Sequence, residues 1–451
     1  MKVIKEKYAQ LIAAQNDPKR SSWAGVNSVT GAGLTSDAVN LILAEAIAAR
    51  TSDIHIEPFQ DMMRIRFRVD GILYEVLNVP HAHNVNIVAR IKVLCNLPTD
   101  AIASRKPMDG RFSAKIGKDE FDFRVATFPT LLGEKIAIRV LSKKHGQVNL
   151  NGIGMNPEDL SKLERIIGCD NGLLIVCGPT GSGKTTTLYS VLNYLHSPRL
   201  NIVTLEDPVE YQIYGINQCD IRKKGDESFA SGLKAVLRQD PDVILIGEVR
   251  DLETAEIAIR ASITGHLVMT SIHANSALGT VVRLVNMGLE RYMVSYAVIG
   301  AVAQRLVPQL CEKCRSPYSI ETSTLRALCE QFDLDLNLFL PAAQTAVREG
   351  KMREVGQAYA EAIAASTATF YKKNGCEHCN GTGYMGRVGI FEVIMFSEEL
   401  RDAIVRGVSL TDLEEIARKK GNRSLAMDAI EKAKLGLVTI DDIYPILLEK
   451  G

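Results

Sequence analysis

One short segment limits the possible folds of this chain more than any other feature. It reads Gly178-Pro179-Thr180-Gly181-Ser182-Gly183-Lys184-Thr185-Thr186. Its first eight residues fit the pattern GxxxxGK[ST], and it lies between an apolar run at 173–176 and a helical pattern from 184 to about 195. A chance glycine turn rarely has such a strand before it and such a helix after it. We therefore interpret residues 178–186 as a phosphate-binding loop.

The residue types in this loop suit a nucleoside triphosphate. Glycines allow backbone N–H groups to converge on phosphate oxygens, and the N-terminus of the following helix adds partial positive charge. We expect Lys184 to reach the β and γ phosphates and the Thr185 hydroxyl to bind Mg²⁺. The loop therefore predicts a nucleotide and a magnesium ion as ligands.

The segments after the loop continue an α/β pattern. Apolar runs at 202–205, 243–246 and 267–269 predict strands, and 252–263 predicts a helix between two of them. This order is typical of a doubly wound parallel sheet. The strand signal stops at Pro308, and residues 398–449 are helical in pattern. We predict a nucleotide-binding core over 155–307 and a helical C-terminal region over 393–451.

The first third of the chain predicts a separate α+β domain over 36–142. Helical spacing up to Arg50 is followed by strands whose residues alternate between apolar and polar, and Arg64, Arg66 and Arg68 share the polar face of one strand. Three like charges repel, so we expect either an anion or a carboxylate partner there, unless the face is merely solvated. Residues 1–35 read as an N-terminal arm and 143–154 as a linker.

Carboxylates follow two strands of the predicted core. Glu206 and Glu210 follow one strand at the sheet edge where ligands of open α/β sheets bind, so they are suited to orient water or metal. A solvated acidic turn is the alternative. Glu248 follows the next strand, where an NTPase carries an acidic group for Mg²⁺ or the attacking water.

Two histidines flank the last strand of the core. We expect His266 and His273 at the same edge of the sheet as nucleotide sensors, with His273 nearer the phosphates. The alternative is a structural role for each ring. Nucleotide sensing and a structural role are about equally supported by the pattern alone.

Four cysteines form two CxxC pairs: Cys311, Cys314, Cys376 and Cys379. Four thiolates in this pattern predict a structural, tetrahedral Zn²⁺ site within a subdomain at 308–392. The interval 315–375 is longer than in most zinc ribbons, and its helical run near 342–365 predicts an insertion. Nine cysteines in 451 residues are too few for a disulfide framework and indicate a reducing cytosol.

Charge and hydropathy narrow the classes of function further. Lys and Arg number 53, and so do Asp and Glu, so no overall positive charge attracts nucleic acid. The longest near-apolar stretch, at 293–303, has about half of the ~20 residues that a spanning helix needs. Residues 1–15 have no continuous apolar core, so we do not expect secretion.

These motifs together resemble the secretion and pilus-assembly ATPases of the type II secretion and type IV pilus systems, over about residues 36–450. The resemblance rests on the phosphate-binding loop and on several further segments: the Asp box at 206–210, the Walker B segment at 237–251, the His box at 266–273, Gly386 to Glu392, and Ser52 to Pro58. It implies a RecA-like P-loop NTPase domain preceded by a PAS-like α+β domain.

The resemblance also implies how the protein works. It implies ATP hydrolysis by a cytoplasmic homo-hexamer, peripheral to the inner membrane through a platform protein and a docking component, without direct nucleic-acid contact. Arg111 and Arg124 of the first domain take the family's phosphate-binding arginine role. ATP is favoured over GTP by the resemblance and by the lack of an NKxD segment. The tetracysteine element favours pilus extension or secretion over retraction.

Three alternatives stay open at this point. The chain is also compatible with a pilus retraction ATPase, with a RecA-like nucleic-acid translocase that grips DNA through a zinc ribbon, and with a nucleotide-binding scaffold that has no turnover. Two departures from the resembled family are the short N-terminal extension and the long cysteine spacing.

Overall fold

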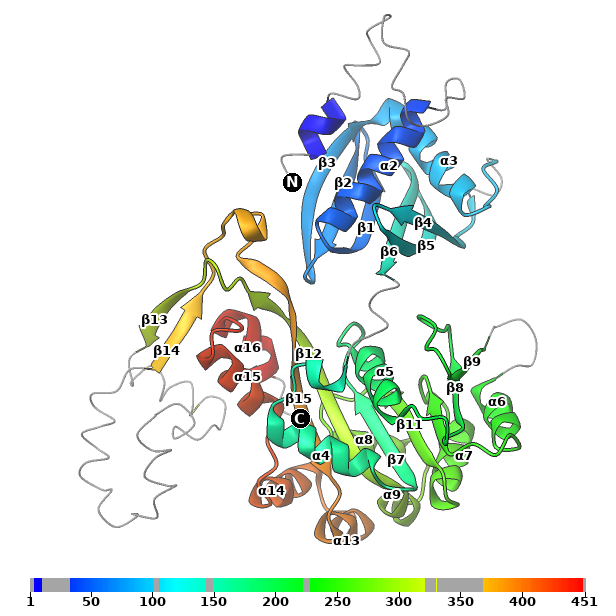
Figure 1. The fold of residues 1–451 in the computed structure, drawn as a ribbon, viewed down its shortest axis with the longest axis vertical. Coiled ribbons are helices and arrows are strands. Elements are labelled where there is room, and N and C mark those ends of the chain that lie inside the picture. The colour runs from blue at the N-terminus through cyan, green and yellow to red at the C-terminus, as the bar shows by residue number, and fades with distance from the viewer. Residues whose placement is uncertain are drawn as a thin grey trace, which may run out of the picture. The chain divides into compact units, whose positions relative to one another are not determined.

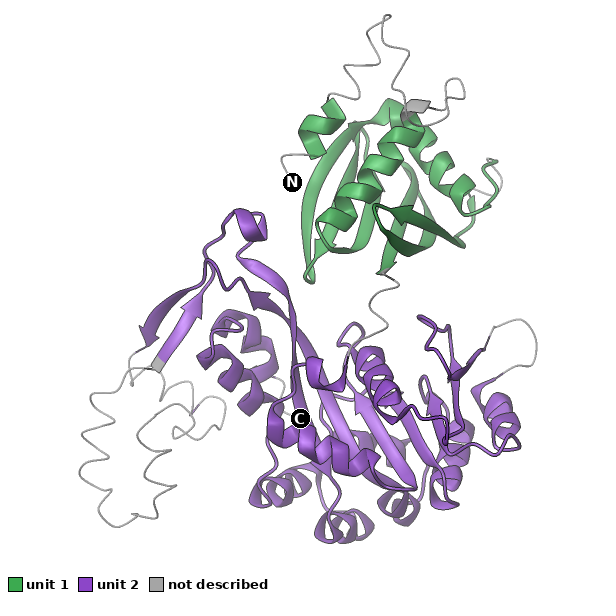
Figure 2. Cartoon of the chain, viewed as in Figure 1, with its two compact units in different colours: residues 1–145 green, residues 146–451 purple. Residues whose placement is uncertain are grey.

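The computed structural model describes residues 4–9, 33–100, 105–142, 149–221, 228–320, 330 and 368–448. The chain forms two compact units, residues 1–145 and residues 146–451 (Figure 2). In the described part of the chain, no helix is both long and apolar enough to span a membrane. The helical insertion predicted near 342–365 lies outside the described residues.

Unit 1 is an antiparallel sheet with helices on one face. Its strands run in the order β3-β2-β1-β6-β5-β4. The elements are α2 (Gly33–Ala48), β1 (Thr51–Pro58), β2 (Met62–Val69), β3 (Ile72–Pro80), η1 (His81–His83), α3 (Asn84–Leu94), β4 (Met108–Ile116), β5 (Asp119–Thr130) and β6 (Gly133–Ser142). The alternation seen in the sequence sends Ile65, Phe67 and Phe123 into a core shared with α2 and α3.

The N-terminal residues differ from the predicted arm. Residues 4–9 are helical, and Ile4 and Tyr8 are buried in the core of unit 1. Lys7 Nζ lies 2.5 Å from the Glu45 carboxylate of α2. The sequence did not predict this helix, because about one and a half helical turns contain too few apolar positions to establish a period.

The polar face of unit 1 has carboxylate partners for its arginines. Glu57 Oε2 lies 3.1 Å from Arg64, and Glu57 Oε1 lies 2.7 Å from Arg66 and 3.2 Å from Lys135. Burial raises the pKa of Glu57, but hydrogen bonds from Arg66, Lys135 and Arg64 outweigh it and bring the pKa down to about 2. We expected either an anion or a carboxylate beside these arginines, and the structure has a carboxylate, that of Glu57.

Unit 2 is built on a seven-stranded sheet in the order β15-β12-β7-β11-β10-β8-β9 (Figure 1). Its strands are β7 (Gly172–Cys177), β8 (Ile202–Glu206), β9 (Asn217–Asp220), β10 (Val243–Ile246), β11 (Leu267–Ile272), β12 (Val298–Leu310) and β15 (Tyr384–Met395). All neighbours pair in parallel except β12 and β15, which are antiparallel. The predicted doubly wound sheet is confirmed.

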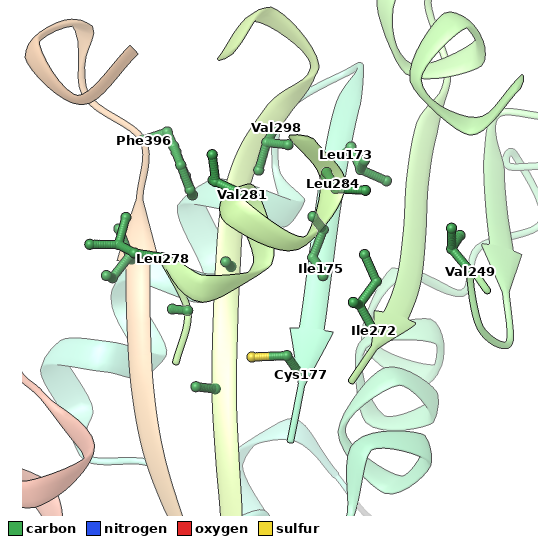
Figure 3. Close-up of a cluster of buried hydrophobic side chains, with 14 of the residues drawn as sticks. Leu173, Ile175, Cys177, Val249, Ile272, Leu278, Val281, Leu284, Val298 and Phe396 are labelled. Atoms are coloured by element: carbon green, nitrogen blue, oxygen red, sulfur yellow. The ribbon is translucent and has the colours of Figure 1, made fainter. Parts of the chain in front are cut away.

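Helices cover both faces of this sheet. They are η4 (Leu150–Gly152), α4 (Pro157–Ile167), α5 (Lys184–Leu195), α6 (Phe229–Val236), α7 (Leu252–Ile263), α8 (Gly279–Asn286) and α9 (Arg291–Ala297). Alternate residues of β7 face opposite layers: Leu173 and Ile175 share a core with residues of α7, α8 and α9, whereas Leu174 and Val176 share one with residues of α4 and α5. Figure 3 shows Leu173 and Ile175 with Val281 and Leu284 of α8. A strand buried on both faces shows a continuous apolar run, as β7 does.

Two predicted boundaries of this unit are wrong. The strand signal was expected to stop at Pro308, but β12 continues to Leu310 and β15 adds an edge strand to the same sheet. The predicted subdomain 308–392 therefore cuts through both strands. β15 was missed because it is buried along most of its length and shows no alternation. The predicted linker 143–154 is shorter, because Leu150 is buried in the core of unit 2.

The C-terminal residues form the predicted helical region. It comprises α13 (Glu398–Arg406), α14 (Leu410–Lys419), α15 (Leu425–Lys434) and α16 (Ile440–Leu448). Ser397, Ser409 and Ser424 cap the first three helices by accepting a hydrogen bond from a first-turn N–H. Near the cysteines, β13 (Ser316–Ile320) and β14 (Ala368–Lys372) form an antiparallel ribbon.

The Glu57→Gln variant tests the charge cluster of unit 1. A pKa held below its ordinary 4.5 contributes stability above that pH, and the contribution is lost as the pH falls toward 2. Solvent screens the part-exposed arginines, so we expect a loss of about 1–2 kcal/mol at pH 7 and a smaller loss at pH 3. Hydrogen exchange of β1 and β2 peptides in the full chain measures it. Equal exchange in this variant and in the exposed control Glu75→Gln at pH 7 would contradict the prediction.

Candidate functional site

The phosphate-binding loop joins β7 to α5 and requires glycine at two positions. Gly178 has φ +148°, and a Cβ there would lie 2.4 Å from the Gln304 carbonyl oxygen of β12. Gly183 has φ +91°, and a Cβ there would lie 2.7 Å from Gln304 Nε2. Left-handed backbone and close approach both exclude a larger side chain. The loop is therefore packed directly against β12.

The loop offers hydrogen-bond donors that suit phosphate and hydroxyl groups that can bind a cation. Lys184 Nζ lies 2.8 Å from the Gly178 carbonyl oxygen and 3.1 Å from that of Pro179, and burial lowers the pKa of this lysine. Thr185 and Thr186, in the first turn of α5, both have exposed side chains. Pro179, Thr180 and Gly181 are exposed as well. The predicted loop residues thus form one open turn at a helix N-terminus.

One buried hydroxyl in this loop supports a ligand. In the described part of the chain, Ser182 Oγ is shielded from solvent and has no hydrogen-bond partner. A buried polar atom without a partner is rare in native structures, and a bound group often explains it. The loop residues therefore fit a triphosphate.

Glu248 and His273 come together at the carboxyl ends of neighbouring strands. Glu248 follows β10, His273 follows β11, and His273 Nε2 lies 4.0 Å from Glu248 Oε2. Arg250 forms an ion pair with Glu248, and its pKa is raised by that hydrogen bond. Ser271 Oγ donates to the Gly247 carbonyl at 2.7 Å, which ties the two strand ends together. These two predicted residues share one site beside the loop, because β11 lies between β7 and β10.

Glu206 lies at the end of β8 but is enclosed by protein donors. Its carboxylate accepts hydrogen bonds from Thr204 Oγ1 at 2.6 Å, from Gln218 Nε2 at 3.2 Å and from the Tyr189 hydroxyl. Burial raises the pKa of Glu206, and these donors partly offset the rise. The backbone N–H of Glu210 lies 3.3 Å from the same tyrosine hydroxyl. This arrangement suits a positioning role for Glu206 rather than direct contact with water.

The expectation that both histidines lie at one edge of the sheet is wrong for His266. It precedes β11, whereas His273 follows it, and six residues of strand place their backbones about 20 Å apart. His266 Nδ1 lies 2.9 Å from the Ala261 carbonyl oxygen at the end of α7. It therefore has a structural role at the edge opposite the phosphate-binding loop. The prediction was wrong because the two histidines are close in sequence but lie at opposite ends of one strand.

Sequence patterns missed three buried polar residues beneath this site. Gln304 and Arg305 are adjacent on β12, and Glu392 lies on β15. Gln304 Oε1 accepts from Thr187 Oγ1 of α5 at 2.7 Å, and Glu392 Oε2 accepts from the Ala277 N–H at 2.8 Å. The signal for Gln304 and Arg305 was a polar pair inside an otherwise apolar strand, and Glu392 ends the segment 386–392 that contributes to the resemblance.

In unit 1, the two predicted arginines belong to a row across the sheet. Arg111 pairs in register with Arg124, and Arg124 with Arg139. Asp53 continues the row, with its carboxylate 3.4 Å from Arg139 and 3.8 Å from Arg68. Paired residues of antiparallel strands point to the same face, so this row presents four guanidinium groups and one carboxylate. The face is suited to an anion.

The four predicted cysteines come together in unit 2. Their sulfur atoms all lie within 4.8 Å of one another: Cys311 to Cys376 is 3.9 Å, Cys314 to Cys379 is 3.8 Å and Cys376 to Cys379 is 3.7 Å. Tetrahedral zinc with ~2.3 Å bonds to sulfur places its ligands about 3.8 Å apart. The cluster therefore has the dimensions of a zinc site.

Backbone donors surround these sulfur atoms. The N–H groups of Cys376 and Gly383 both lie 3.2 Å from Cys379 Sγ, and the N–H of Gly375 lies 3.3 Å from Cys314 Sγ. Burial raises the pKa of Cys379, but these donors and the neighbouring thiols lower it to about 6. Such N–H donors stabilise thiolates, which are the form that binds zinc.

Comparison with known proteins gives consistent matches. A family model described as type II/IV secretion system protein matches residues 29–444. Type II secretion system protein E of Pseudomonas aeruginosa is 40% identical over 412 residues, which cover 91% of this chain and 75% of that protein. The type IV pilus assembly ATPase PilB of Myxococcus xanthus is 40% identical over 406 residues, covering 90% of this chain and 66% of that protein.

Solved structures share the fold. The ATPase DotB of Legionella pneumophila superposes with a TM-score of 0.62 at 19% identity, covering 90% of this chain and 94% of that one. The pilus retraction motor PilT with bound ADP superposes with a TM-score of 0.57 at 23% identity, covering 91% of this chain and 96% of that one. The family model spans most of the sequence and the relatives reach 40% identity, so the resemblance seen in the motifs is confirmed. The chain belongs to the type II/IV secretion system protein family, whose members include secretion and pilus-assembly ATPases.

Proposed function

We propose that this protein hydrolyses ATP to ADP and phosphate and, as a ring of six copies, uses the reaction to drive pilus assembly or type II-like protein secretion. The observation that carries the proposal is the distance of 4.0 Å between His273 Nε2 and Glu248 Oε2. His273 follows β11, which lies next to the strand that leads into the phosphate-binding loop, and Glu248 follows β10, one strand further. A carboxylate at this edge suits activation of water toward a phosphate held by the loop.

The phosphate-binding loop and the residues beside it have distinct parts in this reaction. Backbone N–H groups of 178–184 bind the phosphate oxygens, and Lys184 moves from its carbonyl partners to the β and γ phosphates. Thr185 would hold Mg²⁺, which neutralises charge on the phosphates when bound. Glu248 accepts the proton of the attacking water, and His273 lies close enough to hydrogen-bond the γ phosphate or the water.

The arginine row of unit 1 supplies the remaining positive charge. Arg111 and Arg124 are exposed or part-exposed next to Arg139, and planar guanidinium groups bind phosphate oxygens bidentately. We propose that they complete the site around the γ phosphate, so that hydrolysis changes the relation between the units. Repeated around a ring, that change becomes a mechanical stroke.

The tetracysteine cluster binds Zn²⁺ in this proposal and stabilises the ends of β12 and β15. Closed tetrahedral sites with four thiolates are structural, and no catalytic step depends on the metal. The relatives named protein E and PilB favour assembly or secretion over retraction. We place the ring in the cytoplasm at the inner membrane, bound to a platform protein and a docking component, because the resembled machines work there.

The Glu248→Gln variant tests the catalytic proposal. We expect phosphate release to fall by ~10² to 10⁴ while the affinity for a fluorescent ATP analogue stays within a few fold, because the amide cannot accept a proton. The exposed Glu253→Gln variant on α7 is the matched control. Wild-type turnover in Glu248→Gln would remove this residue from the mechanism.

The double variant Arg111→Gln with Arg124→Gln tests the arginine row. Arginines that stabilise transferred phosphate are worth ~10³ or more in rate, so we expect ATPase activity to fall at least that far at saturating ATP. Lys118→Gln, in the exposed turn after β4, is the control. Full-speed hydrolysis by the purified double variant in its ring form would overturn the proposed role of unit 1.

The Cys379→Ser variant tests the metal site. Elemental analysis by mass spectrometry is expected to find about one zinc per wild-type chain and almost none in the variant, because a structural site needs all four thiolates. A chelator should lower the thermal midpoint of the wild type and leave the variant unchanged. Cys219→Ser, an exposed cysteine outside the cluster, should keep its zinc. A zinc-free wild type would exclude the site.

A further inference from the structure

The loop that carries His273, residues 273–277, is held by its backbone at three successive residues. The Asn275 carbonyl accepts a hydrogen bond from Arg305 Nη2 at 2.9 Å. The Ser276 carbonyl lies 3.3 Å from Cys177 Sγ. The Ala277 N–H donates to Glu392 Oε2 at 2.8 Å. We call residues 273–277 the His273 loop, and its backbone is anchored by side chains rather than by a strand partner at these points.

The anchors come from three adjacent strands of the sheet. Cys177 ends β7, Arg305 lies on β12 and Glu392 lies on β15, and these strands are neighbours in the order β15-β12-β7. Glu392 stands opposite Ala303 in the β12 and β15 pairing, two positions before Arg305. The small alanine side chain leaves room for a carboxylate to reach the loop. The sheet edge thus forms a platform beneath the His273 loop.

Two of the anchors are charged groups in the core. Arg305 is 5% exposed and Glu392 is 9% exposed. Burial raises the pKa of Glu392 to about 7, and the Ala277 N–H and the Arg305 guanidinium partly offset that rise. Buried charges seldom stabilise a fold better than apolar side chains of the same size, because desolvation cancels most of the attraction. We therefore expect Arg305 and Glu392 to position the His273 loop more than they stabilise the fold.

The same strand also supports the phosphate-binding loop. Consecutive residues of a strand point to opposite faces, so Gln304 contacts α5 through Thr187 while Arg305 contacts the His273 loop. Arg305 Nη1 also donates to the Gln304 carbonyl at 3.1 Å, and this is the oxygen against which Gly178 packs. One short piece of β12 thereby fixes the base of both loops.

We propose that Arg305 and Glu392 are positioning residues for ATP hydrolysis, which hold the His273 loop against the platform so that His273 stays beside Glu248. The inference rests on the proposed function. The His273 side chain is 57% exposed, so its position depends mainly on the backbone that carries it. Neither positioning residue needs to contact nucleotide, and neither belongs to the phosphate-binding loop.

The expected kinetic signature is selective. Releasing the loop displaces His273 but leaves Lys184 and the glycines in place, so kcat should fall about 10- to 100-fold while KM for ATP changes less than about threefold. Three variants test this: Arg305→Met, Glu392→Met, and the combination of Arg305→Met with Glu392→Gln. Arg406→Met and Glu398→Gln, both exposed on α13, are matched controls that should keep wild-type turnover.

The combined variant separates positioning from stability. Arg305→Met alone leaves a buried carboxylate with less compensation, whereas the combined variant removes both charges and keeps an oxygen that can accept from the Ala277 N–H. We expect it to recover most of the thermal midpoint lost in Arg305→Met and still turn over slowly. Recovery of turnover together with the midpoint would mean a structural role alone and would overturn the proposal.

Hydrogen exchange gives a readout that does not depend on turnover. Peptides covering 273–277 should exchange at least about tenfold faster in the three variants than in the wild type, with peptides of α5 unchanged. Unchanged exchange in the His273 loop would overturn the proposal even if activity fell. If the wild type did not hydrolyse ATP at all, the proposed function would fail, and the exchange result would still decide whether these residues hold the loop.

Discussion

The site depends on the parallel pairing of β8, β10, β11 and β7. Parallel strands end at the same edge, so segments that are dozens of residues apart in the chain meet there. No local sequence pattern predicts that they do. The phosphate-binding loop follows β7, Glu248 follows β10 and His273 follows β11. A register slip in any one pair would displace the residues that follow that strand from the others. The apolar strands therefore have a functional constraint as strong as the polar residues that follow them.

Buried polar groups in unit 2 are placed where backbone groups would otherwise lack partners. The edge strand β15 is one example, because Asp428 accepts from the Phe391 N–H at 2.8 Å and Lys432 donates to the Gly389 carbonyl at 2.6 Å. Both side chains come from α15, so the C-terminal helices cover an edge that would otherwise pair with another strand. Glu392 follows the same rule beneath the His273 loop, where it accepts from the Ala277 N–H at 2.8 Å. Each buried charge thus connects an element outside the sheet to the strands beneath the site.

Unit 1 uses an antiparallel sheet for a different purpose. Its apolar face is closed by α2 and α3, and its polar face displays aligned arginines around two carboxylates, Asp53 and Glu57. In-register pairing brings Arg111, Arg124 and Arg139 together from three strands, so the positive charge is concentrated in one row. An anion bound there would relieve the repulsion among them.

The sequence by itself determined the phosphate-binding loop, the parallel core strands, the CxxC pairs and the helical C-terminus. Each of these has a local signature, since glycine spacing, continuous apolar runs and cysteine spacing are read within about ten residues. Only the tertiary structure decided the contacts of His266, Glu206, Arg305 and Glu392, because these depend on which end of a strand a residue occupies and which distant groups it meets. The edge strand β15 was likewise invisible until its pairing with β12 was known, since a strand buried on both faces has no periodicity to distinguish it from other apolar segments.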